Sequence, residues 1–231
     1  MSRRRAVLAG GLLALAGCAR DTGTPHPAPL TGPQAETLAL MRFTNYRAGA
    51  ARTTAMIPLP GRAVRLDARL DWRAHTGYGL LSGTGPGASQ HWRHLLRWDR
   101  GGVRVHYDWP GAVPAEPPED GWAERDLQPD TSAVDTALAL LTALASDRPE
   151  NAQLLARSGA RRLGTTTIGG HPVTEFSGPA PRPASSSPGA PAGADGSRTR
   201  YWIDSRGTLR RFAARLPGTS GWMTADLTPV G

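Results

Sequence analysis

Apolar and charged residues alternate strictly over residues 64–73. Every second position is apolar, and each apolar residue is followed by Arg or Asp. A period of two places successive side chains on opposite sides of a strand, so the pattern predicts a strand with one buried and one wet face. The same spacing recurs over 92–98, and Arg100-Gly101-Gly102 then leads into a second apolar run at 103–107. These two runs predict a hairpin.

Three segments carry signals for helices. Thr31-x-x-Gln34 predicts a capped helix that ends near Gly49. Residues 130–132 precede an apolar stripe with helical spacing, formed by Val134, Leu138, Leu141 and Leu144. Asp147-x-Pro149-Glu150 predicts the start of a further helix, which Gly159 should stop.

Strand patterns return after these helices. Gly169-Gly170 separates apolar runs at 163–168 and 173–177, and Asp204-Ser205-Arg206-Gly207 separates 201–203 from 209–216. Such spacing predicts two more hairpins, and residues 222–227 predict a last strand. Eight or more antiparallel strands with a helical insert indicate an α+β domain. We expect the helices to cover the apolar face of the sheet.

The first eighteen residues have the form of a bacterial export signal. Arg3, Arg4 and Arg5 precede an apolar stretch at 6–16, which is too short to cross a bilayer. Leu15-Ala16-Gly17-Cys18 resembles the bacterial lipobox. The resemblance implies that residues 1–17 are a signal peptide and that Cys18 receives fatty acyl chains such as palmitate. An apolar leader that ends by chance at a cysteine is the alternative, and the export route, Sec or twin-arginine, stays open.

Composition divides the rest of the chain. Residues 18–32 contain the lipidated cysteine and a proline-rich run, which predicts a flexible tether. Residues 179–198 are almost all Pro, Gly, Ala or Ser, which predicts a disordered insertion. The remainder of 33–231 forms a single domain, because its last 33 residues are too few to fold alone. One cysteine in 231 residues excludes a disulfide framework.

The basic residues do not indicate nucleic acid. All 27 are Arg, they are dispersed, and the formal charge is +8. Removal of residues 1–17 takes away three Arg and lowers this charge to +5. We therefore expect a protein on the outer face of the cytoplasmic membrane, held by its lipid anchor, with no nucleic-acid partner.

The order of these elements resembles that of a known lipoprotein type. Lipobox, tether, early helix, strand meander, helix pair and hairpins follow one another as in the actinobacterial LppX/LprG type. The local motif is Tyr201-Trp202-Ile203-Asp204-x-x-Gly207-x-Leu209. The resemblance implies the LolA-like fold, which is a curved antiparallel sheet, or half-open β-barrel, with helices over its concave face. It also implies binding of lipids between sheet and helices. The insertion and the proline-rich loop at 110–118 depart from the pattern.

That resemblance directs attention to apolar side chains on the predicted strands and the second helix. The residues we expect to line a ligand cavity are Leu70, Trp72, Leu80, Trp92, Leu96, Trp98, Leu138 and Leu141. Large rings also fill ordinary cores, so core packing of the tryptophans remains open. The leading hypothesis is a lipid or apolar-ligand carrier whose cavity opens near residues 109–122. The alternative is a cell-surface interaction or sensor module with a filled core.

Catalytic and metal signatures are weak. Residues 83–87 are glycine-rich but lack the lysine of a phosphate-binding loop, and no nucleophile elbow is present. On a strand, His91 and His94 would point to opposite faces, which argues against a metal pair. Asp67 and Asp71 alternate with Arg, and we expect them to form cross-strand charge pairs. We therefore predict no enzyme, no metal and no cofactor.

Overall fold

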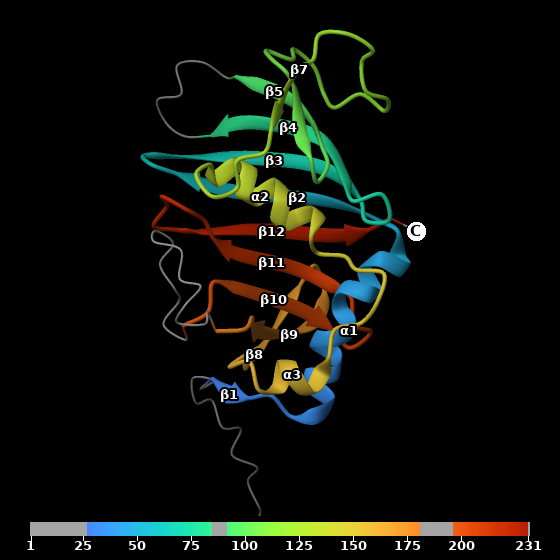
Figure 1. Cartoon of the computed structure of the whole chain (residues 1–231), viewed down its shortest axis with the longest axis vertical. Coiled ribbons are helices and arrows are strands. Elements are labelled where there is room, and N and C mark those ends of the chain that lie inside the picture. Colours follow the sequence, from blue (N-terminus) through green and yellow to red (C-terminus); the bar gives the residue numbers. More distant parts are fainter. Residues whose placement is uncertain (1–26, 85–91, 181–195, 231) are drawn as a thin grey trace, which may run out of the picture.

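The computed structural model describes residues 27–84, 92–180 and 196–230. Their strands form one antiparallel sheet that does not close on itself, in the spatial order β1-β8-β9-β10-β11-β12-β2-β3-β4-β5-β6-β7 (Figure 1). The strands are β1 (Ala28–Pro29), β2 (Ala50–Leu59), β3 (Arg62–Asp71), β4 (Thr76–Thr84), β5 (Arg93–Trp98), β6 (Gly102–His106), β7 (Ala123–Asp126), β8 (Arg161–Ile168), β9 (His171–Ser177), β10 (Thr199–Asp204), β11 (Leu209–Arg215) and β12 (Trp222–Pro229).

The last strand joins the two halves of the sheet. β2 to β7 form a meander, as do β8 to β12, and β12 pairs with β2 from Thr224 opposite Met56 to Pro229 opposite Ala51. The C-terminal residues therefore hydrogen-bond to a strand about 170 positions earlier in the chain. This pairing explains why the sequence after the insertion belongs to the same sheet as residues 50–126.

Three helices accompany the sheet. α1 (Gly32–Ala48) has the predicted capping box, in which Thr31 and Gln34 satisfy each other's backbone N–H groups, and Gly49 ends it. α2 (Ala133–Thr142) is capped by Ser132, whose hydroxyl accepts from the N–H of Asp135. α2 packs on one face against β2, β3 and β4, whereas α1 contacts α3, β10 and β2.

The third helix is shorter than predicted. α3 covers only Ala152–Ala156, and its cap is Asn151, whose side chain accepts from the N–H groups of Gln153 and Leu154. The expected start at Asp147-x-Pro149-Glu150 was wrong. Asn is as good a helix cap as Asp, and only Asn151 stands at the position where its oxygen reaches the second and third helical N–H groups.

The turn between β10 and β11 accounts for the sequence motif noted above. One carboxylate oxygen of Asp204 accepts from the N–H groups of Arg206 and Thr208, at 2.9 and 3.0 Å. The other oxygen lies 2.9 Å from Nε of Arg210. Gly207 has a φ of 77°, a conformation that favours glycine. The motif thus specifies a turn and holds no ligand-directed group.

Several boundaries differ from the sequence predictions. Ala28 and Pro29 pair with β8, so the folded part of the chain begins before residue 33. β2, β4 and the short β7 were not predicted, because their sequences lack strict alternation. Asp67 pairs with Arg65 on its own strand, with 2.6 Å between Oδ2 and Nε, and not across strands. Asp71 accepts from the N–H groups of Arg73 and Ala74 in a turn.

Other predictions fall outside the described residues. These are the signal peptide at 1–17, Cys18, the tether up to residue 26, His91 and the central part of the insertion at 181–195. Among the residues that are described, no helix combines the length and the apolar character that crossing a bilayer requires.

Candidate functional site

The predicted cavity residues lie mainly in one continuous apolar cluster. Leu70, Trp72, Leu96, Trp98, Leu138 and Leu141 are all buried and belong to it. α2 rests directly on the sheet, since Nε1 of Trp98 donates to the backbone carbonyl of Leu138 at 3.1 Å. The structure therefore brings six of the eight predicted residues together, and it places them in direct contact and not around a void.

Leu80 does not join this cluster. It stands opposite Leu95 in the β4–β5 register, while its neighbour Gly79 stands opposite Leu96. Since adjacent residues on a strand face opposite sides, Leu80 lies on the face away from α2. The sequence could not reveal this, because Leu80 and Leu81 are adjacent and either could have faced the core.

Glycines on β4 make room for the tryptophan rings. A Cβ atom on Gly77 would lie 2.1 Å from a ring carbon of Trp98, and one on Gly83 would lie 2.7 Å from Nε1 of Trp92. The rings therefore occupy space that a side chain on either glycine would fill. This glycine–tryptophan packing was missed in the sequence, where no strand was predicted at residues 76–84.

Trp92 marks an accessible edge of the apolar cluster. It is partly buried and packs against the core. His94 stacks on it, with ring centroids 4.8 Å apart, and Tyr107 meets His94 edge-on at 5.1 Å. Arg62 lies over the Trp92 ring at 5.8 Å. We call Trp92, His94 and Tyr107 the aromatic rim.

The rim and the buried layer share one face of the sheet. His94 stands opposite Leu81, and Leu81 stands opposite Leu66. Leu66 and Leu81 are both core residues. Tyr107, at the far end of the rim, keeps 54% of its surface exposed. The partly exposed aromatic rim and the buried layer beneath α2 are thus neighbours on one face of the sheet.

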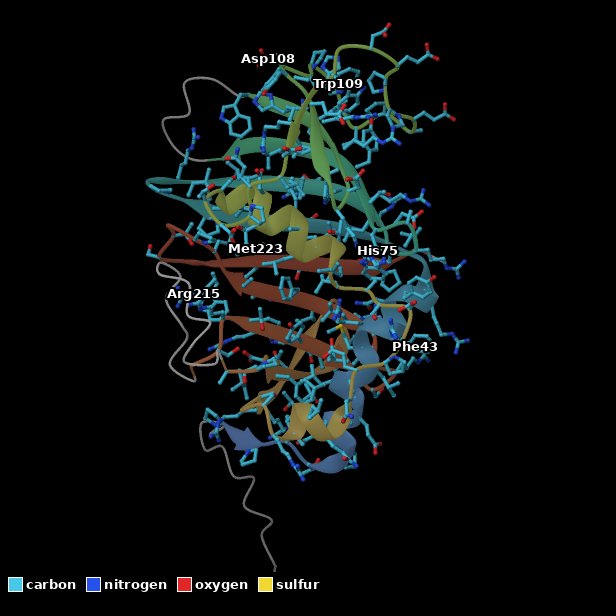
Figure 2. All side chains as sticks on the ribbon, viewed as in Figure 1. Phe43, His75, Asp108, Trp109, Arg215 and Met223 are labelled. Atoms are coloured by element: carbon cyan, nitrogen blue, oxygen red, sulfur yellow. The ribbon has the colours of Figure 1, made fainter. Side chains whose placement is uncertain are left out.

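The loop at 109–122, where a cavity mouth was predicted, holds a second group of aromatic side chains. Trp109 and Trp122 meet His106 edge-on at 5.1 and 5.8 Å. Their indole N–H groups donate to the carbonyls of Ala112 and Pro118. Figure 2 shows Asp108 and Trp109 at the end of the molecule that carries this loop. The loop is internally packed and held by its own tryptophans.

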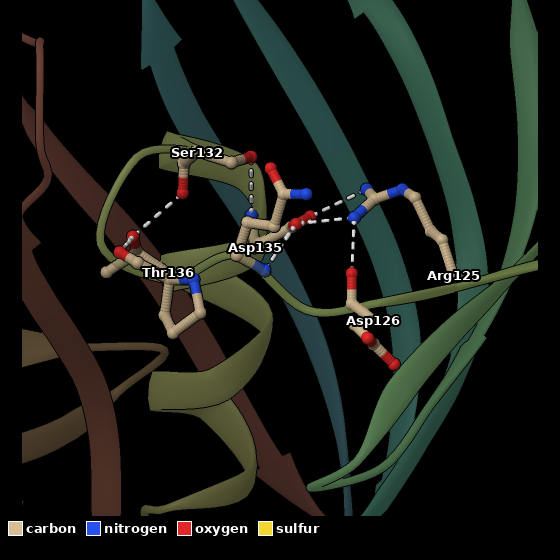
Figure 3. A network of polar contacts seen from close by, with 7 residues as sticks. Arg125, Asp126, Ser132, Asp135 and Thr136 are labelled. Atoms are coloured by element: carbon tan, nitrogen blue, oxygen red, sulfur yellow. Dashed lines mark hydrogen bonds and ion pairs between the residues drawn. The ribbon is translucent and has the colours of Figure 1, made fainter.

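One polar network fixes the start of α2 (Figure 3). The carboxylate of Asp135 accepts from both terminal nitrogens of Arg125, at 2.5 and 2.8 Å, and from the N–H of Gln128 at 2.9 Å. Burial alone would raise the pKa of Asp135, but these hydrogen bonds outweigh it and hold the pKa below its usual value. Among the described residues, no group of three or more His, Cys, Asp or Glu side chains is placed to hold a metal ion.

Comparisons with known proteins give a likeness in structure but none in sequence. No protein-family model and no curated protein matches the chain. The chain resembles the crystal structure of LprF from Mycobacterium bovis, with 12% identity, a TM-score of 0.42, and coverage of 90% of this chain and 97% of that one. A likeness at this level assigns the chain to no family.

Proposed function

We propose that the chain is a lipid-anchored protein of the cell envelope that binds an acyl chain or a similar apolar ligand between the sheet and α2. The protein acts by binding and not by catalysis. The observation that carries the proposal is the position of the aromatic rim beside the buried apolar layer under α2. The lipobox-like sequence that ends at Cys18 supports the anchor.

Binding requires α2 to move away from the sheet. α2 has only ten residues, and its inner side presents Ala137, Leu138 and Leu141, all fully buried. Its displacement would expose a contiguous apolar surface, at a cost of about 25 cal/mol for each Å². An acyl chain in the same space would cover that surface again, so a ligand with higher affinity for the open form shifts the population toward it.

A second function is favoured by a different observation. The layer is filled in this structure, and Trp98 bonds directly to the backbone of α2. A filled core is what an anchored interaction or sensor module would have. That module would bind partners with its outer surfaces and would take up no apolar ligand.

Uptake of a fatty acid distinguishes the two functions. The full chain is titrated with a brominated fatty acid, whose bromine quenches tryptophan emission on contact. We expect the quenching of tryptophan emission to saturate and to include the emission of the buried Trp98. A fraction of the tryptophan emission should be inaccessible to the water-soluble quencher acrylamide. Tyr107→Arg should weaken uptake because it places a charge on the rim, whereas Leu154→Arg, on the exposed side of α3, should not. Absence of saturable quenching would favour the filled module.

A further inference from the structure

A second hollow differs in chemistry from the apolar layer. It has a volume of about 410 Å³ and lies where the C-terminal half of α1, the β3–β4 turn, the β5–β6 turn and the segment after α2 meet. Its lining is polar apart from Ala145. The lining side chains are Arg42, Tyr46, Arg73, His75, Arg100, Ser146, Asp147 and Arg148.

The charge of this lining is strongly positive. The lining has four guanidinium groups and one carboxylate, that of Asp147, which lies 3.6 Å from Arg148. Arg42 is paired with Glu150, which stands outside the lining, at 2.9 Å. The side chains of Asp147 and Arg148 are largely exposed, so their pairing offsets little of the charge. Like charges gathered in one concavity repel one another, and a bound anion relieves that repulsion.

Hydrogen bonds hold the walls of the hollow in place. Arg42 donates to the carbonyl of Ala143 at 2.8 Å and to the carboxylate of Glu150 at 2.9 Å. Arg73 donates to the carbonyl of Arg47 at 3.2 Å. Arg73 is therefore oriented before any ligand arrives, which lowers the entropy cost of binding. All three nitrogens of Arg42 donate to protein oxygens, so Arg42 fixes the wall of the hollow.

His75 shows the same preorganisation. Its Nδ1 lies 3.2 Å from the carbonyl oxygen of Thr142, at the end of α2 (Figure 2). Its φ is 54°, which is rare for a residue with a side chain. Strain of this kind persists only where the surroundings hold the residue, and it is common in ligand-binding sites.

We infer that this arginine-lined hollow binds a phosphate-type oxyanion. The planar fork of arginine donates two parallel hydrogen bonds to phosphate oxygens, and the hydroxyls of Tyr46 and Ser146 offer further donors. A bare apolar ligand offers no acceptor to these donors. The oxyanion could belong to a free phosphate compound or to the headgroup of an anionic phospholipid, since both present the same group. This inference is independent of ligand uptake beneath α2.

Calorimetric titration of the full chain with pyrophosphate tests the free form. We expect saturable binding that becomes at least tenfold weaker in the double variant Arg73→Ala/Arg100→Ala. The matched control is Arg52→Ala/Arg97→Ala, which removes the same charge from exposed positions on β2 and β5 and should change affinity less than twofold. Asp147→Asn removes the one lining carboxylate and should tighten binding a few fold.

A parallel arm tests the headgroup. The same proteins are sedimented with vesicles of phosphatidylglycerol or of phosphatidylcholine. Binding to the first alone, lost in Arg73→Ala/Arg100→Ala and retained in the control, would assign the site to a lipid headgroup. Binding in neither arm, or equal losses in the two double variants, would overturn the inference. Thermal unfolding of each variant shows whether it is folded, and a pocket variant that does not fold is replaced by Arg100→Gln.

Discussion

The guanidinium of Arg125 and the carboxylate of Asp135 form a two-pronged ion pair that joins the end of β7 to the first turn of α2. The carboxylate is almost fully buried, with 1% of its side chain accessible, whereas the guanidinium remains 45% accessible. The pair thus ties the start of α2 to the edge strand β7. Its loss should loosen α2 without altering the apolar contacts themselves.

Asp135→Asn should lower the free energy of unfolding at pH 7 by roughly 1.5–3 kcal/mol, the usual range for hydrogen bonds to a charged group. Folding lowers the pKa of Asp135. Its contribution to the free energy of unfolding is therefore present above the pKa that an Asp carboxyl has in the unfolded chain, about 3.9. The contribution is lost as the pH falls through the folded pKa. Urea unfolding of both proteins at pH 7 and pH 3 measures the difference, which should shrink at pH 3.

Asp226→Asn is the matched control, since Asp226 pairs with Arg211 on the sheet surface and is 54% accessible. Its replacement should cost less than about 1 kcal/mol. An equal loss in the two variants would mean that the ion pair at α2 has no special role.

Leu141→Ala tests the direct contact between α2 and the sheet. Leu141 is 0% exposed, so truncation should leave a cavity and lower the free energy of unfolding by about 2–5 kcal/mol. Leu154→Ala, at a position that is 67% exposed, should have almost no effect. If the ligand-free protein instead holds an open cavity, Leu141→Ala would cost much less, and urea unfolding would show it.

Gly77→Ala tests the packing of tryptophan on glycine. The added methyl would overlap the Trp98 ring, so the ring must shift, at a cost of typically about 1–3 kcal/mol. The near-ultraviolet circular dichroism of the tryptophans should change with it. Gly32→Ala is the control, because a Cβ there meets nothing within 4 Å, and it should leave the unfolding midpoint and the spectrum unchanged.

Periodicity predicted the elements whose two faces differ. β3 and β5 alternate, and they lie close to the positions expected from residues 64–73 and 92–98. Helix starts were predicted where the cap follows a familiar spacing, as at Thr31. α3 was misplaced because Asp147 and Asn151 both have capping side chains, and only the path of the backbone decides between them.

The candidate sites were less accessible to sequence reasoning. Alternation placed Trp98 on the apolar face of a strand, and helical spacing placed Leu141 on the apolar stripe of a helix. Neither pattern could say whether the layer between them is open or filled, because both cases select the same residue types. The arginine-lined hollow was not predicted at all. Arg42, Arg73, Arg100 and Arg148 are spread over more than a hundred positions, and only the meeting of two turns with α1 brings them together.

The anchor is tested most directly at Cys18. Acylation of a lipobox cysteine joins a diacylglyceryl group to its sulfur, and the thiolate is a far stronger nucleophile than a serine hydroxyl. Cys18→Ser should therefore abolish incorporation of an alkyne-labelled fatty acid during growth of the expressing cells. Because Cys18 is the sole cysteine of the chain, no other thiol can carry the label.

Thr22→Ala, four residues further on, is the control and should be labelled to the same extent as the unmodified protein. Equal labelling of Cys18→Ser and the unmodified protein would show that the leader ends at a cysteine by chance.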